Sequence, residues 1–168
     1  LFLGCDTNDK EAKTKQVFRY NEHKNIGSLD PAFAKDNADI SAVNQLFNGL
    51  VQMDSLMNVM PSIASSWQIS ENAKTYTFEL RKDVYFHTHT LFGTEETRTV
   101  TAGDFVYSFD RLKDPKLASP GGWVLQNVES YKALNEHSFQ INLKSPFPAF
   151  LGLLTMKYCS VVPKEIVA

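Results

Sequence analysis

The chain has 168 residues, of which 43% are hydrophobic and 21% charged, a composition typical of a globular protein with a buried core. Seventeen Lys and Arg residues stand against nineteen Asp and Glu residues, which gives a formal net charge of −2. A weak negative charge without a basic stripe gives no general attraction for phosphate backbones, so no nucleic-acid partner is expected.

The first residues, Leu1 to Cys5, have the form of a bacterial lipoprotein processing signal. A short apolar tail is followed by the small Gly4 and then by Cys5, whose thiol would carry the lipid. Residues 6–16 contain no aromatic or branched aliphatic side chain and predict a flexible polar tether. We therefore expect residues 1–5 to be the remnant of a signal peptide and Cys5 to anchor the protein to a membrane. The alternative is a chance apolar start with a buried Cys5.

The first half of the folded part predicts few regular elements. The expected segments are a strand at 17–20, a loop at 21–36, a helix at 39–50 and an irregular connection at 53–66. Asp39 or Ser41 would cap the helix, because a side-chain oxygen there can accept a hydrogen bond from a free helical amide. Pro61 interrupts any helix in the connection.

Alternation and capping patterns are clearer further along. Apolar and polar residues alternate at 75–81 and at 138–143, which predicts two strands with one buried face each, and Trp67 and Tyr76 are assigned to the core. The other expected segments are a second strand at 84–87, an irregular polar excursion at 88–99, a helix that begins with a capping box at Thr101 to Asp104, a loop-rich stretch at 113–127, a short helix around 147–155 and a strand-like 157–162 with a buried Cys159. The mixture predicts a fold of the α/β to α+β class.

The sequence contains none of the common residue patterns of enzyme active sites. The sequence has no nucleophile elbow, no glycine-rich phosphate loop and no paired-cysteine metal site, so neither catalysis nor a cofactor is expected. His87 and His89 would point to the same side of a strand, but no third metal ligand stands out nearby. A hydrogen-bonded polar role is therefore preferred for both histidines.

Several spaced motifs stand out along the chain: Ser28 to Pro31, Gln45 to Val51, Pro61 to Trp67 running into Thr75 to His87, Val100 to Leu112 followed by Asp114-Pro115 and Ala118 to Pro120, and Val162 to Glu165. In this order they resemble the family 5 extracellular solute-binding proteins, the oligopeptide-, dipeptide- and nickel-binding proteins of ABC importers. The resemblance departs at 88–99, where the family usually makes a shorter Asp-Gly turn, and in this it resembles lipoprotein members from Bacteroidetes-type bacteria. Family members are also much longer than this chain.

The resemblance implies a lobe of a type II periplasmic binding protein (a Venus-flytrap fold), with a mixed sheet and short helices. Residues 17–168 would form the amino-terminal lobe, that is, the start of the first lobe plus an inserted subdomain. In this fold two lobes close over the ligand. The implied location is the cell envelope, in the periplasm or at the outer face of the membrane.

The same resemblance implies capture of oligopeptides for import, with ABC permease subunits as partners and a monomeric protein. Its implied ligand-binding residues are Phe33, Ala34, Lys35, Asp36 and Asn37, after the Leu-Asp-Pro turn, and Gly121, Gly122 and Trp123, after Ser119-Pro120. Core packing of Trp123 and a solvated loop position for Asp36 remain alternatives. The same fold binding a nickel chelate, haem or an oligosaccharide is a second reading, and a hydrolase of an unrelated α+β fold is a third.

Overall fold

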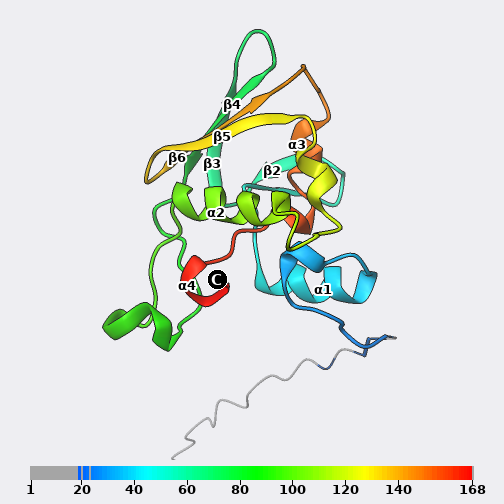
Figure 1. Ribbon diagram of the computed structural model, residues 1–168, viewed down its shortest axis with the longest axis vertical. Coiled ribbons are helices and arrows are strands. Elements are labelled where there is room, and N and C mark those ends of the chain that lie inside the picture. The colour runs from blue at the N-terminus through cyan, green and yellow to red at the C-terminus, as the bar shows by residue number, and fades with distance from the viewer. Residues whose placement is uncertain (1–18, 20, 23, 168) are drawn as a thin grey trace, which may run out of the picture.

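The computed structural model describes residues 19, 21, 22 and 24–167. Cys5, the tether at 6–16 and the expected strand at 17–20, apart from Arg19, lie outside the described residues. The central feature is a four-stranded sheet in the order β3-β4-β6-β5 (Figure 1). Its strands are β3 (Ala64–Ile69), β4 (Thr75–Leu80), β5 (Val128–Asn135) and β6 (Ser138–Leu143), and each runs antiparallel to its neighbours.

Helix α2 (Ala102–Lys113) covers one face of this sheet (Figure 1). Its expected capping box is confirmed, because the Thr101 N–H donates a hydrogen bond to the Asp104 carboxylate at 2.9 Å. Phe105 and Phe109 are fully buried, and their ring centroids lie 5.7 and 5.5 Å from that of Phe139 in β6. The core is thus an aromatic layer between α2 and the sheet.

The other face of the sheet carries polar side chains that bond across the strands. Thr75 donates a hydrogen bond to Asn142, and Asn142 in turn donates to Ser130. Gln140 likewise donates to Thr77. This division into an apolar and a polar face explains the alternation at 75–81 and 138–143.

A second group of shorter elements lies beside α2, on the side away from the sheet. It contains the 3-10 helices η1 (Pro31–Phe33) and η4 (Lys157–Cys159) and the helices α1 (Asn37–Leu46) and α4 (Lys164–Val167) (Figure 1). Further elements are the two-stranded antiparallel sheet of β1 (Val51–Met53) and β2 (Val59–Pro61), the 3-10 helix η3 (Gly122–Leu125) and helix α3 (Phe150–Leu153).

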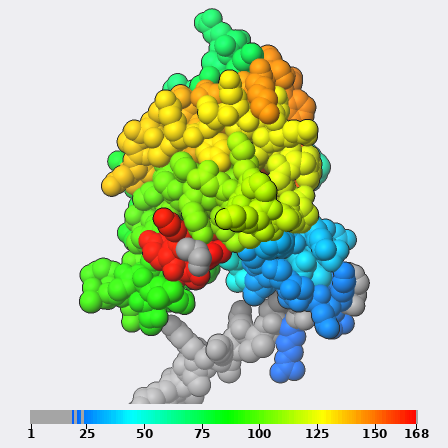
Figure 2. All heavy atoms as spheres, viewed as in Figure 1, coloured from blue at the N-terminus to red at the C-terminus, as the bar shows by residue number. Residues whose placement is uncertain are grey.

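The excursion at 88–99 is partly helical and is held by an arginine. It contains the 3-10 helix η2 (Thr90–Glu95) and projects from the body at the lower left of Figure 2. The Arg98 guanidinium lies 5.0 and 5.5 Å from the ring centroids of Phe86 and Phe92. It also pairs with Asp104 at 2.6 Å and with Glu165 at 2.7 Å. The base of the excursion is thereby fixed to the starts of α2 and α4.

Several predicted elements differ from the structure in their bounds or in their type. The helix expected at 39–50 begins at Asn37 and ends at Leu46, and Asp39 does not cap it. The expected connection at 53–66 contains the last residue of β1, all of β2 and the start of β3, and the expected strand at 84–87 forms a single bridge between Tyr85 and Thr99. The strand-like 157–162 begins as η4, whereas the burial of Cys159 is confirmed. The antiparallel sheet and short helices place the protein at the α+β end of the expected class.

Candidate functional site

The Leu-Asp-Pro turn is organised by the carboxylate of Asp30. One carboxylate oxygen accepts a hydrogen bond from the Ala32 N–H at 3.0 Å and thereby caps η1. The Ser28 hydroxyl oxygen accepts a hydrogen bond from the Asp30 N–H at 3.0 Å. These local bonds, together with the fixed φ of Pro31, give the turn one backbone conformation.

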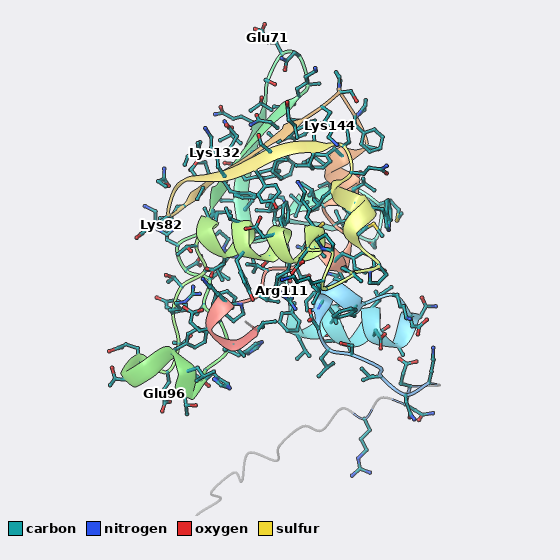
Figure 3. All side chains as sticks on the ribbon, in the orientation of Figure 1. Glu71, Lys82, Glu96, Arg111, Lys132 and Lys144 are labelled. Atoms are coloured by element: carbon teal, nitrogen blue, oxygen red, sulfur yellow. The ribbon has the colours of Figure 1, made fainter. Side chains whose placement is uncertain are left out.

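The same carboxylate joins the turn to the far part of the sequence through Arg111 of α2. The guanidinium donates two hydrogen bonds to Asp30, at 3.0 and 2.6 Å, and the Arg111 side chain is only 13% exposed. Burial raises the pKa of Asp30, but the hydrogen bonds from Arg111 and Ala32 outweigh it and hold that pKa below its usual range. Figure 3 shows Arg111 below α2, where the helix meets the segment before α1.

A second carboxylate, Asp39 of α1, fixes the chain just before the turn. Asp39 is 4% exposed, and its Oδ1 accepts hydrogen bonds from the Gly27 N–H at 2.7 Å and from the Ser28 N–H at 3.3 Å. Residues 25–30 are neither helix nor strand. The exposed residues Ile26 and Leu29 form no hydrogen bond with another residue of the described part of the chain. Among the described residues, the main-chain groups of Ile26 and Leu29 therefore have no hydrogen-bond partner that would compete with a ligand.

The loop at 118–122 contacts this turn directly. The Ser119 hydroxyl donates a hydrogen bond to the Ala32 carbonyl at 2.5 Å, and the Gly121 N–H donates to the Ser119 hydroxyl oxygen at 3.1 Å. Two stretches that are far apart in the sequence are thus joined through one side chain.

A hollow of about 660 Å³ lies between these two stretches. It is lined by Gly27, Ser28, Phe33, Lys35, Asp36, Asp39, Ala118 and Pro120. Its charges are mixed, because the lining contains Lys35 as well as Asp36 and Asp39. Asp36 also pairs with Lys24 at 2.6 Å, and this contact lowers the pKa of the Asp36 carboxyl. The lining offers apolar surface and groups of both charges.

Three of the residues expected to bind ligand, Phe33, Lys35 and Asp36, line this hollow together. Ala34 is buried behind them, and Asn37 is exposed at the start of α1 but is not part of the lining. The structure therefore brings only part of the first expected stretch to the hollow.

The second expected stretch lies behind the rim of the hollow. Gly121 packs against Tyr158, and Gly122 lies close to the Leu112 carbonyl. Trp123 is 52% exposed, which rules out the alternative of core packing, and it lines a different hollow with Phe147 and Leu153.

Sequence reasoning missed Asp39, Gly27 and Tyr158 as residues of this region. An acidic residue near a helix start can cap the helix or bind the preceding loop, so the sequence does not separate these two roles for Asp39. The contact of Gly121 with Tyr158 has no local signal, since it joins two loops that are distant in sequence.

The residues considered for metal binding and nucleophilic chemistry have ordinary partners. His87 Nε2 lies 3.3 Å from the Leu46 carbonyl oxygen, and His89 Nδ1 accepts a hydrogen bond from the Leu91 N–H. Within the described residues, no group of three or more His, Cys, Asp or Glu side chains could hold a metal ion. Burial raises the pKa of the Cys159 thiol to about 12. Of the helices in the described part of the chain, none has the length and apolar character needed to cross a bilayer.

Comparison with protein families and known sequences gives consistent matches. Residues 58–166 match the family model described as bacterial extracellular solute-binding proteins, family 5 Middle. A probable deoxycholate-binding periplasmic protein of Escherichia coli, YgiS, is 33% identical over 171 residues, covering 92% of this chain and 30% of YgiS. The periplasmic oligopeptide-binding protein OppA of Salmonella typhimurium is 32% identical over 170 residues, covering 91% of this chain and 30% of OppA. The chain thus spans about 30% of the length of these curated relatives.

Solved structures confirm the expected type of fold. The substrate-binding domain of an oligopeptide ABC transporter from Bacillus anthracis matches with a TM-score of 0.81 and 26% identity, covering 92% of this chain and 31% of that one. OppA of Haemophilus influenzae, in complex with the peptide RPPGFSPFR, matches with a TM-score of 0.74 and 29% identity over 83% of this chain and 29% of that one. NikZ of Campylobacter jejuni, in complex with Ni(L-His), gives a TM-score of 0.70 and 28% identity over 86% and 27%.

Proposed function

Because the chain belongs to the family 5 bacterial extracellular solute-binding proteins, we propose that it forms one wall of a cleft that captures oligopeptides for an ABC importer. We further propose that residues 17–168 are the start of the first lobe plus an inserted subdomain of a longer, monomeric protein. In this proposal the opposite wall belongs to the second lobe, and permease subunits receive the ligand.

The observation that carries the proposal is the hollow between the Leu-Asp-Pro turn and the loop at 118–120. One of its edges is the irregular segment that contains Gly27 and Ser28, and an extended peptide can bind a segment outside helices and strands through main-chain hydrogen bonds. Main-chain bonds give affinity without selecting side chains. The mixed charges of the lining match the mixed side chains of a peptide ligand.

Titration calorimetry of the full-length protein against a varied set of short peptides tests the proposal. We expect binding in the wild type and at least about tenfold weaker binding in Asp39→Ala, which releases the main chain at 27–28. Asp54→Ala is the matched control, because Asp54 also accepts two main-chain hydrogen bonds, from Leu56 and Asn58, but does not line the hollow. Absence of binding across the whole peptide set would contradict the proposed function.

A different solute on the same fold is the second candidate. NikZ is in complex with Ni(L-His), and YgiS is named for deoxycholate, so relatives of similar identity differ in ligand. A nickel chelate, haem or an oligosaccharide would replace the peptide in this reading. Native mass spectrometry of protein purified from its host separates the two, because a captured peptide pool gives a spread of masses and a single solute gives one.

We also propose that the protein is not an enzyme. The family is one of binding proteins, and the Cys159 thiol, with a pKa of about 12, stays protonated at neutral pH. A peptidase assay on the full-length protein should remain at background; sustained peptide cleavage by purified protein would support the hydrolase alternative.

Anchoring through Cys5 is proposed from the sequence alone. Cys5→Ser should release the protein from the membrane fraction into the soluble fraction. Cys159→Ala is the matched control and should leave the membrane association unchanged. If Cys5→Ser stays with the membrane, lipidation at Cys5 is wrong.

A further inference from the structure

Ala118 and Pro120 form one rim of the hollow, and the next residue, Gly121, packs against the ring of Tyr158. Gly121 is buried, and a Cβ placed on it would overlap Cγ and Cδ1 of Tyr158 and lie 2.7 Å from the Tyr158 Cβ. Real Cβ atoms do not approach other atoms so closely. The loop can therefore lie against Tyr158 only because residue 121 has no side chain.

The next residue is confined on its other side. A Cβ on Gly122 would lie 2.8 Å from the Leu112 carbonyl oxygen, near the end of α2. The loop is thus held between α2 and Tyr158, while the hydrogen bond from Ser119 ties it to Ala32. With these contacts in place, the position of the rim depends on the volume of the Tyr158 ring.

Tyr158 is also connected to the opposite rim. It belongs to η4, which packs against η1, the helix that carries Phe33. Burial raises the pKa of Tyr158, and the nearby carboxylate of Asp36, which lines the hollow, raises it further. The partly buried ring of Tyr158 is therefore connected to both rims of the hollow, to one through the loop at 118–122 and to the other through η1.

We infer that Tyr158 is a positioning residue that acts as a spacer: its ring, packed against Gly121, sets the separation of the two rims and so limits the ligand side chain that this wall accepts. The inference rests on the proposed function, because it assigns a selectivity to the same hollow. Tyr158 is not part of the lining and contacts the ligand only through the loop that it supports.

Two substitutions change this contact in opposite senses. Gly121→Ala pushes the loop away from the ring, whereas Tyr158→Ala lets the loop move toward the space that the ring leaves. The affinities of the full-length protein for the tripeptides Ala-X-Ala, with X from Gly to Trp, give the readout by calorimetry. We expect the ratio of the Kd values for X = Trp and X = Ala to change by about tenfold, in opposite directions, in the two variants.

Four further variants separate a spacer from a general structural role. Tyr158→Phe keeps the ring and should keep the wild-type ratio. Tyr158→Gly combined with Gly121→Ala removes the three atoms that lie nearest to the new Cβ, so the ratio of this double variant should approach that of Tyr158→Gly alone. Gly103→Ala is the control, because its Cβ would meet the Thr101 hydroxyl oxygen at an ordinary 3.6 Å. Thermal unfolding of each variant confirms that it is folded, and the Tyr158 variants alone carry the test if Gly121→Ala does not fold.

The outcomes distinguish the inference from the proposed function. A wild-type protein that binds none of the Ala-X-Ala peptides contradicts peptide capture and with it the spacer role. A wild type that binds them, with ratios unchanged in folded Tyr158→Ala, contradicts the spacer role alone. Equal shifts in Tyr158→Phe and Tyr158→Ala would assign the effect to the hydroxyl group and would also overturn the inference.

Discussion

The layer of α2 and the sheet is held together differently from the region around the hollow. The first depends on fully buried rings, such as Phe105, Phe109 and Phe139, which pack without directional bonds. The second depends on a few directional contacts between distant segments, such as the pairing of Asp30 with Arg111. Apolar burial supplies most of the stability, whereas the directional contacts fix the shape of the site. The site can therefore be altered by changes that leave the fold intact.

The largest effect on stability is expected in the sheet. Phe139→Ala should lower the free energy of unfolding by about 3–5 kcal/mol, because it leaves a cavity among the surrounding rings. Gln140→Ala, on the polar face of the same strand, should cost only about 1 kcal/mol. Urea unfolding measures both. Similar losses in the two variants would show that the two faces of the sheet contribute equally, contrary to the comparison.

The sheet layer was also the part most open to prediction. The strands at β4 and β6 follow from alternation, and α2 follows from its capping box and helical spacing, because each pattern has a local physical cause. In β5 nearly all side chains are at least partly exposed, so that strand has no alternating pattern to detect. Strand β3 begins with Ala64, Ser65 and Ser66, small residues with little preference for strands, and it pairs because β4 lies beside it.

The region around the hollow could be predicted only in part. The resemblance to a family indicated the stretches 33–37 and 121–123, but the residues that hold them in place were not visible. Asp39 forms its bonds with residues of the preceding loop, and Arg111 pairs with Asp30, which lies 81 residues earlier in the sequence. Such pairs leave no period or spacing in the sequence, because each is formed only when the tertiary structure is complete.

Breaking the contact of Asp30 with Arg111 should affect stability less than the core substitution does. Arg111→Met should lower the free energy of unfolding by about 1–3 kcal/mol, since it leaves a partly buried carboxylate without its partner. A double-mutant cycle with Asp30→Asn isolates the pairwise contribution. Arg81→Met, which breaks the exposed pair with Asp83, is the control and should leave unfolding unchanged. A coupling of zero between positions 30 and 111 would contradict the role assigned to this pair.

A smaller effect is expected from pH. The folded-state pKa of Asp30 lies below the ordinary value of 3.8, so the unfolded state binds a proton more readily than the folded state does. Asp30 therefore contributes stability that is fully present above about pH 4–5 and is lost as the pH falls through the folded-state pKa. The unfolding free energies of the wild type and of Asp30→Asn should differ at neutral pH and converge in acid. A constant difference over the whole range would show that the charge of Asp30 is not what stabilises the turn.

The smallest effect on stability is expected from replacing an alanine in a left-handed backbone conformation by glycine. Each of the two regions contains one such alanine. Ala73, in the turn between β3 and β4, has φ of 52°, and Ala118, at the rim of the hollow, has φ of 50°. Glycine removes the cost of this left-handed conformation, but it also makes the unfolded chain more flexible, so each Ala→Gly substitution should raise the free energy of unfolding by at most about 1 kcal/mol.

Only Ala118→Gly should also weaken ligand binding, because it loosens a rim whose position depends on directional contacts. Thermal unfolding and calorimetry of the two full-length variants provide the comparison. Equal ligand affinities would mean that the rim does not need a rigid backbone at Ala118, and that the contacts of Ser119 and Gly121 are sufficient to hold it.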